Sequence, residues 1–264
     1  MRSQYETGGK MLEQFSLKWK VALVTGSSRG LGWAIAQALA GAGAHVVLNG
    51  RDAGRVGPRV DEAKKNGWSA STSIFDVTDG PAVADGIARI EKDQGHLDVL
   101  VNNAGIVIRK PTLETSDQDW QTVIDSDLTA CFRLSREAAR GMVKRKWGRI
   151  IMISSVMGTI ARPTIASYVA SKAGLHGLTR ALGVELGPMG VNVNCIGPGF
   201  YPTEANDVVR NNKQFYDWVC GRSPLGRWGD PKELGGAAIY FASEASSFCN
   251  GQVLTIDGGM IAAL

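Results

Sequence analysis

Paired cysteines, clustered histidines, long hydrophobic runs and a strong net charge are all missing from this 264-residue chain. Its longest apolar stretches have only the length of a strand, so we expect no transmembrane helix. The 29 basic and 25 acidic residues give a net charge of +4, and without a basic run interleaved with aromatics nucleic acid is not an expected partner. The four scattered cysteines and three scattered histidines indicate no metal site and a reducing, cytoplasmic environment.

The N-terminal segment Met1–Lys10 is polar and lacks the apolar centre of a signal peptide. The regular pattern begins near Phe15, so we expect residues 1–14 to be a disordered extension, with Met11 as an alternative start. No linker or repeat divides residues 15–264, which predicts a single domain. Within it, glycine and proline punctuate residues 197–228, and we expect this insertion to form a lid over a binding site, with one or two short helices.

Short apolar runs alternate with segments of helix length along this domain. The predicted strands are Val21–Thr25, His45–Asn49, Ser69–Phe75, Leu97–Val101, Arg149–Ser154, Val191–Ile196 and Val253–Ile256. The predicted helices include Leu31–Ala42, Pro81–Gln94, Asp117–Lys146, Ala166–Leu186 and Pro231–Ser243. Such alternation, with nearly continuous apolar strands, is typical of a parallel sheet buried between helices. The sequence therefore predicts an α/β fold: one Rossmann-like, doubly wound parallel sheet of about seven strands with helices on both faces.

The first predicted strand runs directly into a glycine-rich segment, Thr25-Gly-Ser-Ser-Arg-Gly-Leu-Gly32, which precedes a predicted helix. Gly26, Gly30 and Gly32 allow a tight turn and a close approach of the backbone to a pyrophosphate. The start of the following helix supplies N–H donors and the positive end of the helix dipole. The spacing departs from Gly-x-Gly-x-x-Gly, but the order of strand, glycines and helix predicts a dinucleotide site.

The second predicted strand leads into Arg51, where dinucleotide sites normally place an acid for the ribose 2′-hydroxyl. Arg29, inside the glycine-rich segment, adds a second cation. Two guanidiniums suit a phosphate monoester, so we expect a preference for NADP(H), with NAD(H) as the alternative. The other interpretation of Arg51 is a surface residue paired with Asp52.

Tyr168 and Lys172 are four residues apart in a predicted helix and therefore share one of its faces. A nearby ammonium stabilises phenolate, so such a tyrosine can act as a general acid and base on an alcohol or carbonyl oxygen. Taken alone, this spacing is also common on solvated helix faces. The rest of the sequence favours the catalytic interpretation.

Five motifs resemble, in order and spacing, those of the short-chain dehydrogenase/reductase family. They are Thr25-Gly-xxx-Gly-x-Gly32, Asn102-Asn-Ala-Gly105, Ser155, Tyr168-xxx-Lys172, and Pro198-Gly199 with Thr203, and the resemblance covers nearly the whole chain from about Phe15. It implies Tyr168 as acid/base, Lys172 as the residue that tunes Tyr168 and binds the nicotinamide ribose, and Ser155 as a partner of the reacting oxygen. The cofactor-binding residues that it implies are Gly26, Ser28, Arg29, Gly30, Leu31, Gly32, Arg51, Asp76, Val77, Asn103, Ala104, Gly105, Tyr168, Lys172, Pro198, Gly199 and Thr203.

One position departs from the family pattern. Many members carry asparagine in the helix before the catalytic serine, where it helps to hold a water that links the lysine to solvent; here Asp127 stands at that place. Aspartate keeps acceptor capacity but loses the amide donors. We expect Asp127 to stabilise the Lys172 ammonium, and the water relay to survive if a backbone carbonyl holds it.

A narrower resemblance is to the gluconate 5-dehydrogenase-like branch of this family. It rests on Phe15-Ser-Leu17, on Asn102–Ile106 leading to Arg109, on the segment 217–231, and on the segments 246–251 and 257–260. Arg109 and Arg162 fall where relatives carry arginine, and arginine binds a carboxylate bidentately, so both are candidate substrate-binding residues together with Ser155. The alternative for both arginines is a structural ion pair at a subunit interface.

These observations favour an NADP(H)-dependent dehydrogenase or reductase of a sugar acid, such as gluconate and 5-keto-gluconate. One alternative is a reductase of another carbonyl compound: a 3-oxoacyl thioester, a steroid or a small ketone. A second alternative, against which the intact Ser155, Tyr168 and Lys172 argue, is a non-catalytic NADP(H)-binding protein. The family resemblance also implies a homotetramer with the C-terminal segment near a subunit interface.

Overall fold

The computed structural model describes residues 12–203 and 211–263. The predicted α/β fold is confirmed: seven strands form one parallel sheet in the order β3-β2-β1-β4-β5-β6-β7. The strands are β1 (Val21–Val24), β2 (His45–Gly50), β3 (Ala70–Ile74), β4 (Val99–Asn102), β5 (Gly148–Ile153), β6 (Val191–Pro198) and β7 (Val253–Ile256). Each overlaps its predicted range; most of them are nearly continuous apolar runs, as buried parallel strands are, whereas β3 has the sequence Ala-Ser-Thr-Ser-Ile.

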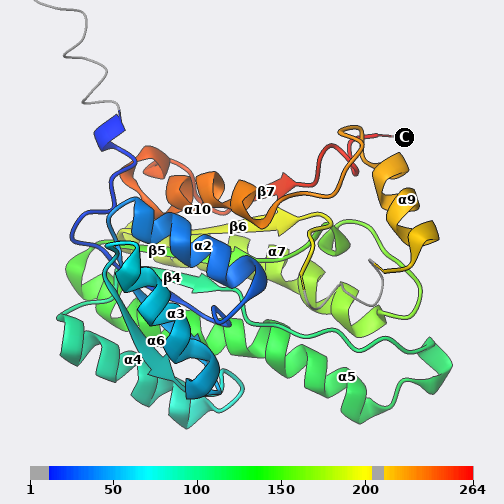
Figure 1. The fold of residues 1–264 in the computed structure, drawn as a ribbon. Helices are drawn as coiled ribbons and strands as arrows, with labels where there is room; N and C mark the ends of the chain where they lie inside the picture. Colours follow the sequence, from blue (N-terminus) through cyan, green and yellow to red (C-terminus); the bar gives the residue numbers. More distant parts are fainter. Residues whose placement is uncertain (1–11, 204–210, 264) are drawn as a thin grey trace, which may run out of the picture.

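Helices cover both faces of the sheet (Figure 1). On one face lie α2 (Gly30–Gly41), α3 (Ala53–Lys65) and α10 (Gly235–Ala242), and on the other lie α4 (Gly80–Gln94), α6 (Ala130–Arg145) and α7 (Ala166–Leu186). Side chains such as Leu39 and Phe241 bury the first face, and Leu134 and Leu175 bury the second. The strand order reverses between β1 and β4, and ligands bind outside the carboxyl ends of the strands at such a point.

Helix α3 is not among the helices named from the sequence, and it forms although it contains two glycines and Pro58, which are turn signals; Asp52 caps its start by accepting a hydrogen bond from Gly54 N at 2.8 Å. The predicted helix Asp117–Lys146 is divided into α5 (Asp117–Ile124) and α6 by the π-helical turn η2 (Asp125–Thr129). Periodicity cannot reveal such a turn, because the apolar pattern continues through it.

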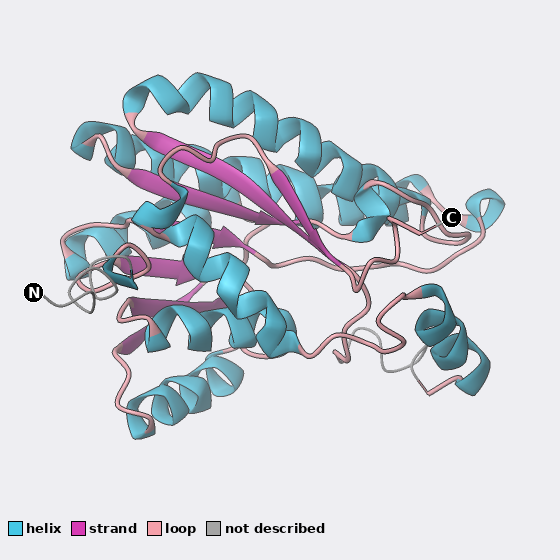
Figure 2. Ribbon diagram, turned by 90° about the horizontal axis from the view of Figure 1, so that it is seen from above, coloured by secondary structure: helices cyan, strands magenta, loops and turns pink. Residues whose placement is uncertain are grey.

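The insertion predicted as a lid contains α9 (Lys213–Arg222), while residues 204–210 lie outside the described part of the chain. Figure 2 shows α9 beyond one end of the sheet.

Residues 1–11 of the predicted N-terminal extension lie outside the described part of the chain as well. Gln14 follows them, and its carbonyl accepts a hydrogen bond from Ala245 N at 3.1 Å. None of the helices in the described ranges has the length and apolar character needed to cross a bilayer.

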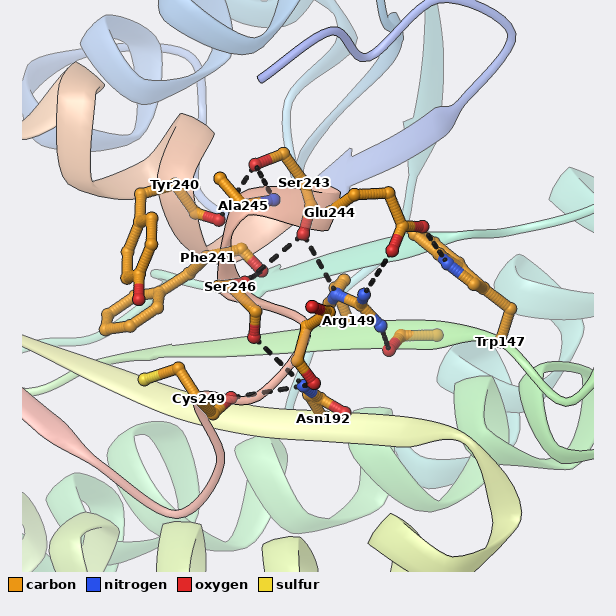
Figure 3. A network of polar contacts seen from close by, with 12 residues as sticks. Trp147, Arg149, Asn192, Tyr240, Phe241, Ser243, Glu244, Ala245, Ser246 and Cys249 are labelled. Carbon is orange, nitrogen blue, oxygen red and sulfur yellow. Dashed lines mark hydrogen bonds and ion pairs between the residues drawn. The ribbon is translucent and has the colours of Figure 1, made fainter. Parts of the chain in front are cut away.

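A polar network secures the amino ends of β5 and β6, at the edge of the sheet opposite the carboxyl ends (Figure 3). The buried guanidinium of Arg149 donates to Ser243 O and Gly148 O and lies 3.5 Å from Glu244, which also accepts from Trp147 Nε1 at 2.6 Å. This network joins the sheet to the segment that follows α10.

Candidate active site

A cavity of about 790 Å³ opens at the carboxyl ends of the strands. Every residue that the sequence predicted for catalysis, cofactor binding or substrate binding lines this one cavity. Residues far apart in the chain meet there because parallel strands end at the same edge of the sheet. The structure thus brings the predicted residues together, whatever role each of them has.

The glycine-rich turn is fixed against the end of β4. Thr25 Oγ1 accepts hydrogen bonds from Asn103 N at 3.0 Å and Ala104 N at 3.1 Å, and Asn103 Nδ2 donates back to Thr25 O at 2.8 Å. A Cβ atom on Gly32 would overlap Asn103 Nδ2 and would lie 2.6 Å from Gly26 O, so only glycine fits there. No side chain caps the start of α2 and its first turn holds no acid, which leaves a backbone cradle suited to an anion.

Arg51 lies at the rim of this cradle, at the end of β2. Its guanidinium is 3.5 Å from the carboxylate of Asp76, whereas Asp52 is paired with Arg55 at 3.6 Å. Burial alone would raise the pKa of Asp76, but hydrogen bonds from Thr78 and the charge of Arg51 outweigh it and lower that pKa below its ordinary value. Arg51 is largely exposed and remains accessible to a ligand phosphate.

Ser155, Tyr168 and Lys172 occupy the centre of the cavity. Ser155 follows β5, and its Oγ accepts a hydrogen bond from Met157 N at 3.1 Å, so its hydroxyl hydrogen is available to a ligand. Tyr168 and Lys172 lie one turn apart on α7, with the ammonium 5.4 Å from the centroid of the phenol ring. The buried Lys172 Nζ donates to Ile153 O at 3.1 Å.

Asp127, in the π-helical turn η2, contacts Lys172 directly. Its Oδ2 lies 3.2 Å from Lys172 Nζ, and its Oδ1 accepts a hydrogen bond from Ile106 N at 2.8 Å. Burial lowers the pKa of Lys172, but the negative charge of Asp127, with a contribution from Tyr168, outweighs burial and raises it above its ordinary value. Lys172 is therefore an ammonium at neutral pH.

Two arginines lie toward the mouth of the cavity. Burial, and then the positive charge of Arg109, lower the pKa of Arg162, so two guanidiniums repel each other there. The Arg162 guanidinium lies 4.3 Å from the ring centroid of Phe215 in α9 and 6.0 Å from that of Phe200. Phe200 and Phe215 belong to an aromatic cluster with Trp218 and Trp228. A half-buried cation that shares a cavity with a second cation suits an anionic ligand.

The sequence missed residues that support this centre. Ser154 Oγ donates to Lys172 O at 2.9 Å and lies 3.0 Å from His176 Nε2. His176 could have been predicted from the sequence, because it lies four residues after Lys172 and therefore on the same helix face. The aromatic cluster could not be found, because Phe200 and Phe215 are separated by the part of the insertion that carries no periodic pattern.

This arrangement is that of an oxidoreductase that acts on CH–OH groups: a phenol beside an ammonium and a serine hydroxyl, next to a glycine-lined anion cradle. Residues 26–261 match a family model described as enoyl-(acyl carrier protein) reductase. The chain is 45% identical over 250 residues to the gluconate 5-dehydrogenase of Gluconobacter oxydans, covering 95% of this chain and 98% of the relative. It is 41% identical over 254 residues to the 5-keto-D-gluconate 5-reductase of Escherichia coli K12, covering 96% of this chain and all of the relative.

Solved structures of similar sequence have the same fold as this chain. A gluconate 5-dehydrogenase from Burkholderia cenocepacia, in complex with NADP and tartrate, superimposes with a TM-score of 0.94 at 39% identity, covering 96% of this chain and 100% of the other. A 3-oxoacyl (acyl-carrier-protein) reductase from Agrobacterium tumefaciens with NADP bound gives a TM-score of 0.90 at 32% identity, covering 96% and 99%. The chain belongs to the short-chain dehydrogenase/reductase family.

The close contact at Gly32 gives a first prediction. Gly32→Ala should weaken dinucleotide binding at least about tenfold, because the added methyl group must displace Asn103 or the turn. Gly41→Ala is the matched control: it lies in the same helix with nothing within 4 Å of the new Cβ, and it should bind normally. Titration of each variant with NADPH, followed by nicotinamide fluorescence, measures both; equal affinity of the Gly32 variant and the parent would contradict the cradle.

Proposed function

We propose that this protein interconverts a secondary alcohol and a ketone of a sugar acid with NADP(H), and that gluconate and 5-keto-gluconate are its substrate pair. The observation that carries the proposal is the position of Arg109 and Arg162, two cations that line the same cavity as Ser155, Tyr168 and Lys172. A neutral ketone has no need of two guanidiniums beside the reacting group. An aldonate does, because its carboxylate must be held while its hydroxyl reacts.

The NADP(H) preference is supported at the other end of the cavity. A dinucleotide would lie with its pyrophosphate against the glycine-rich turn, and Arg29 and Arg51 would bind the 2′-phosphate. Both solved relatives described above contain NADP. Asp76 and Val77 would flank the adenine, and Pro198, Gly199 and Thr203 would hold the nicotinamide amide. The fit is favourable on this structure because the cradle is backbone-lined and the rim is cationic.

The chemistry follows from the groups at the centre. A bound nicotinamide supplies the hydride to the ketone carbon or accepts it from the alcohol carbon. In oxidation, the Tyr168 phenolate takes the hydroxyl proton of the substrate; in reduction, the Tyr168 phenol returns a proton to the oxygen. Ser155 donates its hydroxyl hydrogen to that oxygen and fixes its position. The Lys172 ammonium favours the phenolate through its positive charge.

We further propose that the protein is a cytoplasmic homotetramer. Large apolar side chains stay exposed on α7, where Val184 is 79% exposed, and around β7, where Leu254 is 40% exposed on the last strand of the sheet. Exposed apolar side chains on these elements would be covered in an assembly. The C-terminal segment follows β7 directly and would lie near a subunit interface. Four free cysteines are compatible with a reducing compartment.

The mechanism predicts that Tyr168→Phe lowers kcat with 5-keto-gluconate by at least about a hundredfold, because the proton donor is lost while the ring stays. NADPH affinity should change little, and Tyr216→Phe, which removes an exposed phenol, should leave the rate unchanged. Absorbance of the nicotinamide measures the turnover. A panel of 5-keto-gluconate, a 3-oxoacyl thioester, a steroid and a small ketone separates the candidate substrates by kcat/KM. Full activity of the Tyr168 variant would refute the mechanism.

The carboxylate site predicts that Arg162→Met raises KM for gluconate by about tenfold or more, because a charge-assisted hydrogen bond is lost. Turnover of a neutral polyol, however slow, should be unaffected. Arg136→Met is the matched control, since Arg136 also lies over a phenylalanine ring, at 5.5 Å, but on the surface of α6. If gluconate and the neutral polyol lost the same factor, Arg162 would support the lid and would not bind the carboxylate.

The 2′-phosphate site predicts that Arg51→Ala weakens NADPH binding by about tenfold and leaves NADH binding nearly unchanged. NADH is the internal control, because it differs from NADPH only in the phosphate. Dissociation constants from fluorescence titration of the two dinucleotides decide the question. An equal loss for both would show that Arg51 acts through Asp76 and the adenine end of the site.

A further inference from the structure

The buried carboxylate of Asp127 occupies a site that the backbone is shaped to hold. Asp127 is fully buried, and a Cβ atom on Gly105 would lie only 2.9 Å from its Oδ2 and 3.2 Å from its Oδ1. The π-helical turn η2 interrupts the helix at this residue, and Ile106 N donates to Oδ1. Turns of this kind inside helices occur frequently at functional sites.

The ion pair with Lys172 is the only compensation for one of the two carboxylate oxygens. Among the described residues, Asp127 Oδ2 has no hydrogen-bond partner, and the Lys172 ammonium lies 3.2 Å from it as an ion-pair partner. Lys172 Nζ donates one hydrogen bond, to Ile153 O, so further N–H groups of the ammonium remain for a ligand. A buried charge without its partner is costly, so neither side chain can turn away.

The two cysteines and the histidine around Lys172 carry no charge near neutral pH. Burial raises the pKa of Cys131, on α6, to about 12 and that of Cys195, on β6, to about 11. Burial and the charge of Arg180 lower the pKa of His176, on α7. Tyr168 on α7 is the remaining titratable group that faces Lys172, and Arg109 and Arg162 line the same cavity. Asp127 is therefore the one negative charge at this centre among the described residues.

We propose that Asp127 is a positioning residue that partly neutralises Lys172 and so makes Tyr168 harder to deprotonate than an uncharged residue at position 127 would. The proposal rests on the proposed function for the role of Tyr168. An ammonium with an unpaired charge would stabilise the phenolate fully, whereas a carboxylate in contact with that ammonium cancels part of its field. The protein would therefore oxidise alcohols best at a higher pH than a variant with an amide at this place.

A titration of the phenol tests this without any substrate. The ultraviolet absorbance of phenolate is followed against pH in the parent and in Asp127→Asn, and the same curve from each protein with Tyr168→Phe is subtracted to remove the other four of its five tyrosines. We expect the Tyr168 transition to move to lower pH by about one unit in Asp127→Asn, since one unit charge is removed beside the ammonium.

Asp125→Asn is the matched control, because it removes the same charge from the same turn while its partner is Gln121; its titration should equal that of the parent. Asp127→Ser removes the charge with a smaller side chain and serves if the asparagine variant does not fold. An unchanged transition in a folded Asp127 variant, or an equal shift in Asp125→Asn, overturns the proposal.

A second readout is the pH profile of kcat/KM for alcohol oxidation, whose acidic limb should move down by the same amount in Asp127→Asn. On that limb the variant should be about tenfold faster than the parent. The titration uses no substrate, so a failure of gluconate as the substrate leaves its result valid. Failure of the titration alone would leave the sugar-acid proposal intact.

Discussion

A single buried ammonium, that of Lys172, constrains the whole ligand-binding end of this molecule. A charge placed in a protein interior costs several kcal/mol unless hydrogen bonds and an opposite charge offset the loss of water. Two elements supply that compensation: β5 through Ile153 O and η2 through Asp127. Three features of the fold serve this one group. The π-helical turn between α5 and α6 carries Asp127, the absence of a side chain at Gly105 leaves room for the Asp127 carboxylate, and the end of β5 supplies Ile153 O.

The two ends of the sheet have different roles in this molecule. The amino ends of β5 and β6 are closed by charged and polar contacts around Arg149 and Asn192 that serve to hold the last helices in place. The carboxyl ends of the strands leave backbone donors and side chains directed into a cavity. Within that cavity the cations are spread along its length, with Arg29 and Arg51 at one end and Arg109 and Arg162 at the other. This distribution suits a ligand pair with negative charge at both extremes.

The strands and the residues around the cavity could be predicted from sequence because each left a local signal. Apolar runs marked the strands, and the glycines, Ser155 and the Tyr168–Lys172 spacing marked the site. What could not be predicted depends on contacts between distant segments. The π-helical turn at Asp127 follows from packing against Gly105 and Lys172, and helix α3 forms in spite of Pro58 because Val56 and Val60 bury against the sheet. The pairing of Arg51 with Asp76 was equally invisible, since Asp52 is its neighbour in sequence.

The aromatic cluster beside Arg162 has an optical consequence. Trp218 stacks on Phe215 with centroids 5.5 Å apart, and Trp228 lies 6.3 Å from the same ring, which in turn faces the Arg162 guanidinium. The emission of an indole depends on the charges and rings in its immediate surroundings. Any ligand that draws Arg162 away from Phe215 therefore changes the environment of two tryptophans at once, so the molecule carries its own fluorescent reporter at the mouth of the cavity.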